Sequence, residues 1–377
     1  MRHGVSRAPS FAILSALPPT QSGSAYFGAA LADGLESAGA EVTVVRIADG
    51  AAGADSRLIG ELVTGDSGSV AAAAELLNQS DVAVIAHDHG VHGDDSGGYL
   101  VDLVEGLRVP SILIVRTVLK DPSPQQRSIV ESLIAGTDHV VVLSAAAHTR
   151  LCSLYDVERR KVSTIAHGSS PRADALLKRP SRPTLVTWGL LRPGKGIERV
   201  IDAMAFLRTL PGRPKYQVTG PTHPTVLATE GEAYRDALIE QIGLNGTADA
   251  VTFDPTYRIG ATLSALIRSA TAVVLPYDST DQAASSLLVE AIAHGRPVVA
   301  TAFPHAVELL SSGAGIVVEH DPDALSSALH RVLTQPRLSG SMAAEARALA
   351  PAMAWRQVAS TYLSLAQRLV AQRRTLV

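Results

Sequence analysis

Residues 82–86 read Val-Ala-Val-Ile-Ala, an apolar run that lies between the polar residues Asp81 and His87. A strand that is buried on both faces of a parallel sheet has such an unbroken run, whereas a half-exposed strand alternates apolar and polar residues. Similar short runs recur along the chain and alternate with longer stretches of helical spacing. This alternation predicts right-handed β-α-β units in open, doubly wound α/β sheets.

The predicted elements fall into two series. In the first half we expect strands at residues 11–16, 41–47, 81–87, 110–116, 139–144 and 162–167, with helices at 25–38, 69–79 and 124–135 among them. In the second half we expect strands at residues 184–189, 216–220, 251–254, 272–277, 297–301 and 315–319, with helices at 197–207, 233–242, 261–270 and 285–294. Helices then dominate to the end.

A stretch rich in Pro, Ser and basic residues, 168–183, separates the two series and is typical of an interdomain linker. We therefore expect two domains, residues 1–170 and 171–352, with a ligand-binding cleft lined by both. Residues 353–377 are expected to form a closing helix that packs back toward the N-terminal domain. An alternative for this helix is contact between its arginines and anionic lipid; they are Arg368, Arg373 and Arg374.

The composition excludes several classes of protein. The chain of 377 residues is 46% hydrophobic and carries a net charge of −3, which excludes a disordered chain and disfavours a nucleic-acid-binding protein. No uncharged apolar stretch reaches about 18 residues, so we expect no transmembrane helix. With Cys152 as its single cysteine and an N-terminal apolar run too short for a secretory leader, the chain is expected in the cytoplasm. Peripheral contact with the inner face of the membrane is an alternative.

The first predicted strand is followed by a loop of small residues, 17–24, and then by a helix. The free N–H groups of such a helix start can bind a ligand, and Ser22 and Gly23 are the candidates. The loop lacks the G-x-G-x-x-G pattern of dinucleotide-binding proteins. The alternative is a simple turn in which Ser24 caps the helix.

A second candidate loop lies in the second half of the chain. Residues 188–196 read Trp-Gly-Leu-Leu-Arg-Pro-Gly-Lys-Gly between a strand and a helix. The spacing imitates a P-loop, but Gly196 stands where the magnesium-binding Ser or Thr would be, which excludes a P-loop ATPase. Arg192 and Lys195 beside a helix N-terminus suit a diphosphate. The alternative is a flexible surface turn with two solvated cations.

A third candidate is the loop and helix at residues 276–291. Ser285 and Ser286 begin the helix and can bind an anion, and Glu290 in its second turn can accept hydrogen bonds from vicinal hydroxyls. The alternative for Glu290 is an exposed helix residue.

A fourth stretch, residues 87–95, holds three His and three Asp, but its spacing fits no compact zinc motif. We expect an acceptor-binding or plain loop there, and no metal.

Taken together, these motifs resemble the retaining glycosyltransferases of family 4, which have the GT-B fold. Residues 189–196 resemble the donor-phosphate loop of the family, and residues 295–301 its G-x-P-V-V-A-T strand. Residues 116–124, 220–224 and 231–235 resemble a mannosyltransferase-like subgroup. The resemblance implies two Rossmann-like domains facing across a cleft, an N-terminal one for the acceptor and a C-terminal one for the nucleotide sugar.

The resemblance also implies residue roles. Glu290 would contact the nucleotide ribose, Gln282 the donor sugar and Lys195 the diphosphate. The implied catalytic residues are Arg116, Gln282 and Lys195. The implied donor-binding residues are Ser22, Gly23, His87, Arg192, Lys195, Gln282, Ala284, Ser285, Ser286 and Glu290. The donor would be GDP-mannose, or UDP-glucose as second choice, with no cofactor and no essential metal; the acceptor and the oligomeric state stay open.

Three positions depart from the family pattern. Gln282 replaces a glutamate, Leu190 replaces an arginine of the phosphate loop, and Arg116 replaces a histidine that ends a strand. Arg116 is expected either to pair with Asp88 or to meet an anionic group of donor or acceptor. These departures motivate the alternative of a non-catalytic nucleotide-sugar-binding or partner protein. A third possibility is another GT-B catalyst, such as a sugar-nucleotide epimerase.

Overall fold

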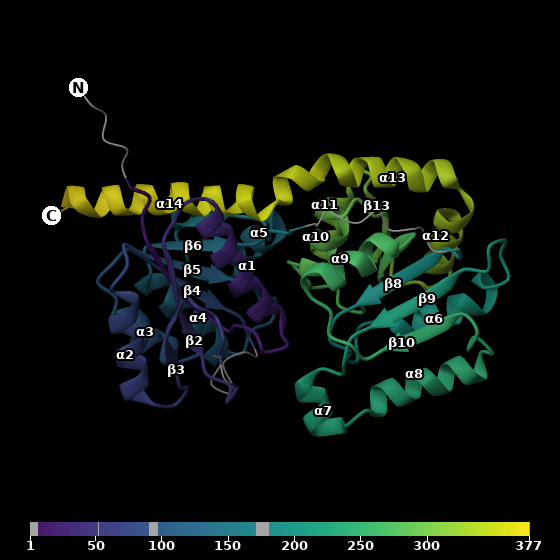
Figure 1. The fold of residues 1–377 in the computed structure, drawn as a ribbon, viewed down its shortest axis with the longest axis horizontal. Coiled ribbons are helices and arrows are strands. Elements are labelled where there is room, and N and C mark those ends of the chain that lie inside the picture. Colours follow the sequence, from purple (N-terminus) through teal and green to yellow (C-terminus); the bar gives the residue numbers. More distant parts are fainter. Residues whose placement is uncertain (1–6, 52, 90–96, 171–180, 377) are drawn as a thin grey trace. The chain divides into compact units, whose positions relative to one another are not determined.

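The structure is a computed structural model that describes residues 7–51, 53–89, 97–170 and 181–376. It consists of two compact units (Figure 1). Unit 1 comprises Met1–Gly168 and Trp355–Val377, and unit 2 comprises Ser169–Ala354. The chain therefore crosses between the units twice, and each unit is a parallel α/β layer structure of the predicted class.

Unit 1 contains a seven-stranded parallel sheet in the order β3-β2-β1-β4-β5-β6-β7. Its strands are β1 (Phe11–Ser15), β2 (Val42–Ile47), β3 (Leu58–Leu62), β4 (Val82–His87), β5 (Ser111–Val115), β6 (His139–Val142) and β7 (Val162–Thr164). Every residue of β4 is buried, as its apolar run predicts. The strand order reverses between β1 and β4, so the loops that follow these strands meet at the carboxyl edge of the sheet.

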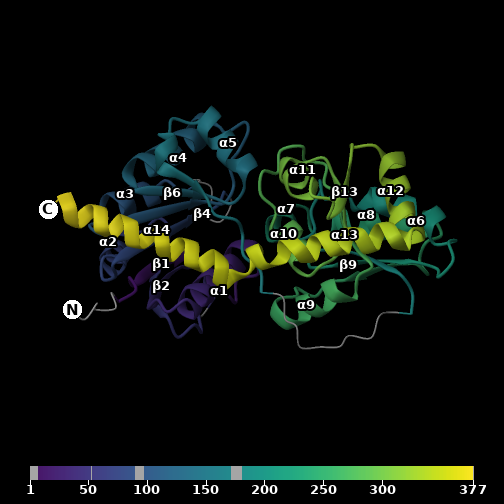
Figure 2. The same ribbon diagram turned by 90° about the horizontal axis from the view of Figure 1, so that it is seen from above.

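The helices of unit 1 form two layers. They are α1 (Gly23–Ser37), α2 (Ser67–Leu77), α3 (Tyr99–Glu105), α4 (Pro124–Gly136), α5 (Ala145–Leu154) and α14 (Trp355–Leu376), with a 3-10 turn at Arg159–Lys161. Because α1 crosses the sheet in the opposite direction from α2, α3 and α4, right-handed connections place it on the opposite face. Helix α14 packs along α1 (Figure 2). Gly34 permits this approach, since a Cβ there would lie 3.2 Å from the Trp355 carbonyl oxygen.

Unit 2 contains a six-stranded parallel sheet in the order β10-β9-β8-β11-β12-β13, the strand order of a Rossmann fold. Its strands are β8 (Thr184–Trp188), β9 (Lys215–Thr219), β10 (Val251–Asp254), β11 (Ala272–Leu275), β12 (Val298–Thr301) and β13 (Gly315–Val318). Its helices are α6 (Ile197–Leu207), α7 (Pro224–Glu230), α8 (Ala233–Leu244), α9 (Gly260–Ser269), α10 (Ser286–Ala293), α11 (Pro304–Leu310), α12 (Pro322–Thr334) and α13 (Pro336–Leu349), followed by a 3-10 turn at Ala350–Met353.

Two hydrophobic cores cover the two faces of this sheet. One contains side chains of α6, α8 and α12, including Ile201, Met204 and Leu329. The other contains side chains of α9, α10 and α11, including Ile267, Ile292 and Leu310. The sheet is therefore buried on both sides. Its strand order reverses between β8 and β11, and open α/β sheets usually bind ligands beyond the carboxyl ends of the strands at such a point.

The sequence predicts the strands well except for β3, which it misses. This strand lies at the edge of the sheet, contains Gly60 and is only partly buried, so it lacks an unbroken apolar run. Residues 171–180 of the predicted linker and residues 90–95 of the fourth candidate stretch lie outside the described residues. Within the described part of the chain, no helix is long and apolar enough to cross a membrane.

Candidate functional site

The loop that follows β8 is hydrogen-bonded to the loops on both sides of it. Toward β9, the Leu191 N–H donates to the Pro221 carbonyl at 2.8 Å, and the His223 N–H donates to the Leu191 carbonyl at 2.7 Å. Toward β11, the Asp278 N–H donates to the Gly194 carbonyl at 3.0 Å. The backbone of this loop is therefore anchored on both sides, whereas Arg192 is exposed, as the alternative of a surface turn with solvated cations expects.

Two glycines allow these loops to approach one another. Gly196 has a φ of +67°, and a Cβ there would lie 1.7 Å from the Pro276 carbonyl oxygen. Gly220 has a φ of +139°, and its Cβ would lie 2.1 Å from the Gly189 carbonyl oxygen. Only glycine fits at both places, because any side chain would overlap backbone atoms of a neighbouring loop.

Lys195 extends from this loop over an aromatic ring. Its Nζ lies 4.7 Å from the centre of the Tyr277 ring. Neither Lys195 nor Arg192 forms an ion pair with any residue that the structure describes, whereas Arg199 pairs with Asp278 at 2.5 Å. The two cations of the predicted diphosphate loop thus have no counter-charge among the described residues.

The ionisation of nearby groups reflects this uncompensated positive charge. Burial and the adjacent Arg192 lower the pKa of Lys195 to about 8. Burial, Arg192 and Lys195 also lower the pKa of His223. A bound anion would oppose both shifts, since an opposite charge favours the protonated forms. The arrangement is that of an anion site.

The start of α10 is held by a histidine that the sequence does not single out. The Ser285 N–H donates to Nδ1 of His305 at 2.8 Å, and Oγ of Ser285 caps the helix by accepting from the Leu288 N–H. Burial lowers the pKa of His305, so its ring is a neutral acceptor. Nε2 of Gln282 donates to the Ala284 carbonyl at 3.2 Å, so this amide is engaged within its own loop.

Glu290 is buried in α10, with 5% of its surface exposed, so the alternative of an exposed helix glutamate is wrong. Its Oε2 accepts a hydrogen bond from Oγ of Ser169 at 2.7 Å. Its Oε1 has no partner among the described residues. Burial raises the pKa of Glu290 to about 7, against the opposing effect of Ser169. One carboxyl oxygen is thus buried without a hydrogen-bond partner in the described part of the chain.

In unit 1, Arg116 follows β5 and forms the expected ion pair with Asp88. Its Nη1 donates to Oδ2 of Asp88 at 2.8 Å and to Oγ of Ser24, and its Nη2 donates to the Gly23 carbonyl at 3.2 Å. The guanidinium also lies over the Phe27 ring, at 4.9 Å. Arg116 therefore ties the ends of β4 and β5 to the start of α1.

Asp88 has further partners that balance its charge. Ser24 donates to its Oδ2 at 2.7 Å, and Thr117 to its Oδ1 at 2.8 Å. Although burial alone would raise it, the pKa of Asp88 is held below its usual value by Arg116 and these hydroxyls. The positive charge of Arg116 is thus compensated within unit 1, and its role in catalysis stays a prediction.

The other predicted residues of unit 1 lie close to Arg116. Ser22 caps α1 by accepting from the Ala25 N–H at 3.1 Å, so the prediction of Ser24 as the cap is wrong. His87 is buried at the end of β4, where its ring packs edge-to-face on His89 at 4.8 Å. The residues that the structure describes contain no cluster of His, Cys, Asp and Glu able to hold a metal ion.

The predicted residues thus form two groups, each at the carboxyl edge of one sheet. In unit 2 these are Arg192, Lys195, Gln282, Ala284, Ser285, Ser286 and Glu290; in unit 1 they are Ser22, Gly23, His87 and Arg116. The sequence analysis missed His223, His305 and Ser169 as site residues. The first two follow β9 and β12, so inspection of every strand end would have found them, but no signal marks Ser169.

Replacing Gly196 tests whether the close approach to Pro276 shapes the site. We expect Gly196→Ala to lower the free energy of unfolding by at least about 1 kcal/mol, because alanine is strained at positive φ and its Cβ overlaps a carbonyl oxygen. The matched control is Gly243→Ala in α8, where a Cβ would meet no atom within 4 Å. Chemical denaturation should show a loss only in the first variant, and equal stability of both would contradict the assignment.

Replacing Arg116 tests its role as a structural tie. We expect Arg116→Ala to destabilise the fold by about 3 kcal/mol, because it leaves the Asp88 carboxylate largely buried and unpaired. Adding Asp88→Asn to this variant should recover part of the loss. Thermal and urea unfolding of the two variants and of Asp88→Asn alone measure the coupling, and additive losses would show that the two side chains act independently.

Comparison with known proteins adds sequence evidence for unit 2. Residues 182–335 match the model of the family described as "Glycosyl transferases group 1". The D-inositol 3-phosphate glycosyltransferase of Salinispora arenicola is 29% identical over 268 residues, which are 65% of this chain. That of Frankia alni is 28% identical over 62% of this chain. The matches span 58% and 60% of the lengths of these two relatives.

Solved structures share the architecture of the whole chain. Sucrose-phosphate synthase from Thermosynechococcus elongatus has a TM-score of 0.76 at 18% identity, covering 96% of this chain and 99% of that protein. The Anabaena protein HepE, solved with UDP, has a TM-score of 0.74 at 16% identity, covering 95% and 100%. The chain thus has the GT-B fold, and residues 182–335 in its second unit match the group 1 glycosyl transferases.

Proposed function

We propose that this chain is a retaining glycosyltransferase that moves a hexose from a nucleotide diphosphate sugar to an acceptor. The observation that carries the proposal is the pair of cations without a counter-charge, Arg192 and Lys195, in the loop after β8. They lie where the strand order reverses, which is the usual ligand-binding place in an open α/β sheet. The family match of this unit supports the proposal.

The chemistry of such a transfer needs what this loop supplies. As the bond between sugar and phosphate breaks, negative charge develops on the leaving diphosphate, and preorganised cations and helix N-termini stabilise it. If the acceptor enters on the face that the diphosphate leaves, a leaving phosphate oxygen can take the acceptor proton. The configuration is then retained without a carboxylate nucleophile. In this scheme Glu290 accepts from the ribose hydroxyls through Oε1, and Gln282 contacts the sugar.

The substrates are proposed by class. GDP-mannose is the first donor to test, because motifs of this chain resemble a mannosyltransferase-like subgroup, and UDP-glucose is the second. The curated relatives are named for D-inositol 3-phosphate, so a phosphorylated polyol is the first acceptor to test. A thermal-shift panel of GDP, UDP and ADP distinguishes the donor bases, because a bound nucleotide stabilises the fold by mass action.

A non-catalytic nucleotide-sugar-binding protein is the second candidate. Two observations favour it: Arg116 is paired with Asp88, and the amide of Gln282 is bonded within its own loop. Slow hydrolysis of the donor without acceptor separates the two candidates. Hydrolysis of one nucleotide sugar supports the enzyme, whereas binding without hydrolysis or transfer supports the second candidate.

Replacing Lys195 tests the diphosphate assignment. We expect Lys195→Ala to weaken nucleoside diphosphate binding by about 1.5–3 kcal/mol, the strength of a hydrogen bond to a charged group, and to leave nucleoside binding unchanged. Since the pKa of Lys195 is about 8, diphosphate affinity of the parent should also fall as the pH rises above 8. Calorimetric titration measures both effects.

The control for this experiment is Lys215→Ala, at the amino end of β9, on the opposite edge of the same sheet. It should change neither affinity. Equal losses of nucleoside and diphosphate affinity in Lys195→Ala would contradict the diphosphate assignment, and so would an unchanged pH profile in that variant.

Replacing Glu290 tests whether its buried carboxyl is kept for ligand binding. Its pKa of about 7 in the folded chain exceeds the ordinary value of 4.5, so its contribution to stability is lost as the pH rises between these values. Glu290→Gln keeps an acceptor for Ser169 but no charge. We therefore expect the variant to be more stable than the parent by about 3 kcal/mol at pH 8, and equally stable near pH 4.5.

The same variant should bind the nucleoside more weakly than the parent at pH 8, because an amide oxygen is a weaker acceptor than a carboxylate. Urea unfolding and calorimetry give the two measurements. A variant that is less stable at every pH would show that Glu290 is structural, and unchanged nucleoside affinity would remove it from the ribose site.

A further inference from the structure

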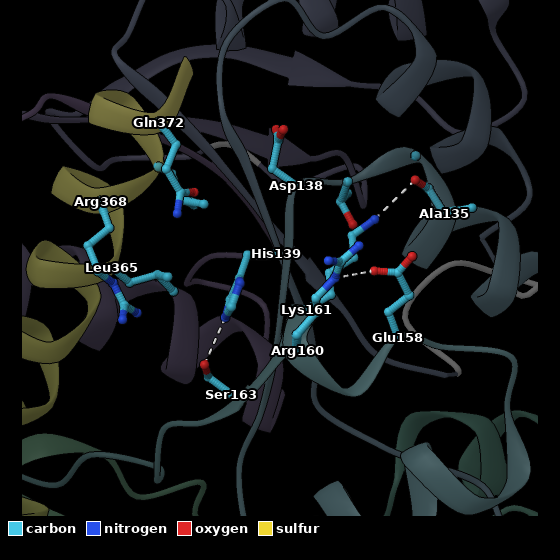
Figure 3. Close-up of a pocket in the computed structure, with 13 residues that line it drawn as sticks. Ala135, Asp138, His139, Glu158, Arg160, Lys161, Ser163, Leu365, Arg368 and Gln372 are labelled. Atoms are coloured by element: carbon cyan, nitrogen blue, oxygen red, sulfur yellow. Dashed lines mark hydrogen bonds and ion pairs between the residues drawn. The ribbon is translucent and has the colours of Figure 1, made fainter. Parts of the chain in front are cut away.

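Unit 1 contains a pocket of about 760 Å³ far from the predicted site residues of its own sheet. Its walls include the start of β6 at His139, the residues just before β7, the end of α4, and α14 (Figure 3). Ser22, His87 and Arg116 follow the carboxyl ends of strands, whereas this pocket lies at the amino ends. No role is yet assigned to it.

Most charges around the pocket are paired. Arg160 pairs with Glu158 at 2.7 Å. Lys161 donates to the carbonyls of Ile134 and Ala135 at the end of α4, the latter at 3.1 Å. These hydrogen bonds use two of its three donors, and the bond to a carbonyl does not neutralise its charge.

Arg368 is different, because it lines the pocket and forms no ion pair or side-chain hydrogen bond with any described residue. The other charged group on this wall, Asp138, is held by the N–H and Oγ of Ser111 and lies 4.0 Å from Arg373. The pocket lining therefore has the cations Arg160, Lys161 and Arg368 and the carboxylates Glu158 and Asp138, both of which also act on Lys161. Among the described residues of this lining, Arg368 is the cation without a paired carboxylate.

The pKa of His139 responds to the positive charge in this pocket. It lies between Arg368 and Lys161, is buried, and bonds through Nε2 to Oγ of Ser163 at 2.8 Å (Figure 3). Burial, Arg368 and Lys161 together lower its pKa. The buried side chains of Leu365 and Leu369 form an apolar wall, which strengthens electrostatic interactions inside the pocket.

We propose that this pocket binds a phosphate monoester, with its phosphate held by Arg368, Lys161 and the His139–Ser163 pair. A phosphate group supplies a counter-charge for Arg368, and its oxygens can accept from a guanidinium, an ammonium and a hydroxyl at once. The pocket has room for more than the phosphate, so the monoester carries an organic group. The proposal is independent of the function proposed for unit 2.

The ester can be a free metabolite or the headgroup of a phosphatidic acid, because both present the same dianion. Glycerol 3-phosphate is the probe for the first source. Vesicles of phosphatidylcholine with and without phosphatidic acid are the probe for the second. Binding of either probe through Arg368 supports the proposal and identifies the source.

The test compares the full-length protein with Arg368→Gln and with the control Arg374→Gln, which removes the same charge from an exposed position of α14 outside the pocket. We expect Arg368→Gln to weaken probe binding about tenfold or more, and Arg374→Gln to leave it within about twofold. Circular dichroism confirms that both variants fold.

Nuclear magnetic resonance of His139, assigned with His139→Gln, supplies a second measurement. A bound dianion favours the imidazolium, so the probe should raise the pKa of His139. The cations Arg368, Lys161 and Arg160 near the ring oppose this rise, and the carboxylates Glu158 and Asp138 favour it. An unchanged His139 titration in saturating probe overturns the proposal. So does binding that survives Arg368→Gln but is lost in Lys195→Ala, which places the probe at the donor loop.

Discussion

The contact between residue 196 and the carbonyl of Pro276 is the constraint on which the proposed donor site of unit 2 depends. The strand order reverses between β8 and β11, so the loops after these strands run next to each other without a strand between them. Only a glycine lets them touch. This contact places the start of α6, and it positions Lys195 above Tyr277 while the Asp278 N–H closes the loop on Gly194.

Each unit has a cation at the carboxyl edge of its sheet, and the two cations differ in whether a carboxylate pairs with them. Arg116 in unit 1 donates to a carboxylate, a hydroxyl and a carbonyl. Its charge is therefore paired within the protein, and its bonds connect the ends of β4 and β5 to the start of α1. Lys195 in unit 2 has an aromatic ring below it and pairs with no carboxylate of the described residues, and burial and Arg192 lower its pKa. An anion gains much more at Lys195, because no protein carboxylate has to be displaced.

The sequence predicts those parts of the structure that depend on local patterns. Central strands such as β4 are found because burial on both faces demands apolar runs, and the site loops are found because they follow such strands. Edge strand β3 is missed because partial exposure and Gly60 leave no clear period. The choice between Ser22 and Ser24 as helix cap depends on one backbone angle, which the pattern does not reveal.

Contacts between distant segments are the other part that sequence reasoning cannot reach. Ser169 and Glu290 lie 121 positions apart, and their hydrogen bond exists only because the chain crosses into unit 2 beside α10. The same holds for His305 in the first turn of α11, which accepts a hydrogen bond from the Ser285 N–H at the start of α10. The sequence alone does not distinguish such a serine or histidine from others, because both residue types are common in loops. The contacts that each one makes depend on how distant segments pack.

The three residues that depart from the family pattern share one property in the structure. Gln282 bonds its own loop, Arg116 bonds Asp88, and Leu190 brings no charge, so none of them offers an unpaired charge to a donor sugar. The cations without an ion-pair partner among the described residues of the proposed donor site, Arg192 and Lys195, lie in the loop proposed to hold the leaving diphosphate. Transfer that depends on stabilising the leaving group needs no titrating side chain beside the sugar, because the departing phosphate can take the proton. The departures are therefore compatible with transfer, provided that the loop of Lys195 supplies the main stabilisation.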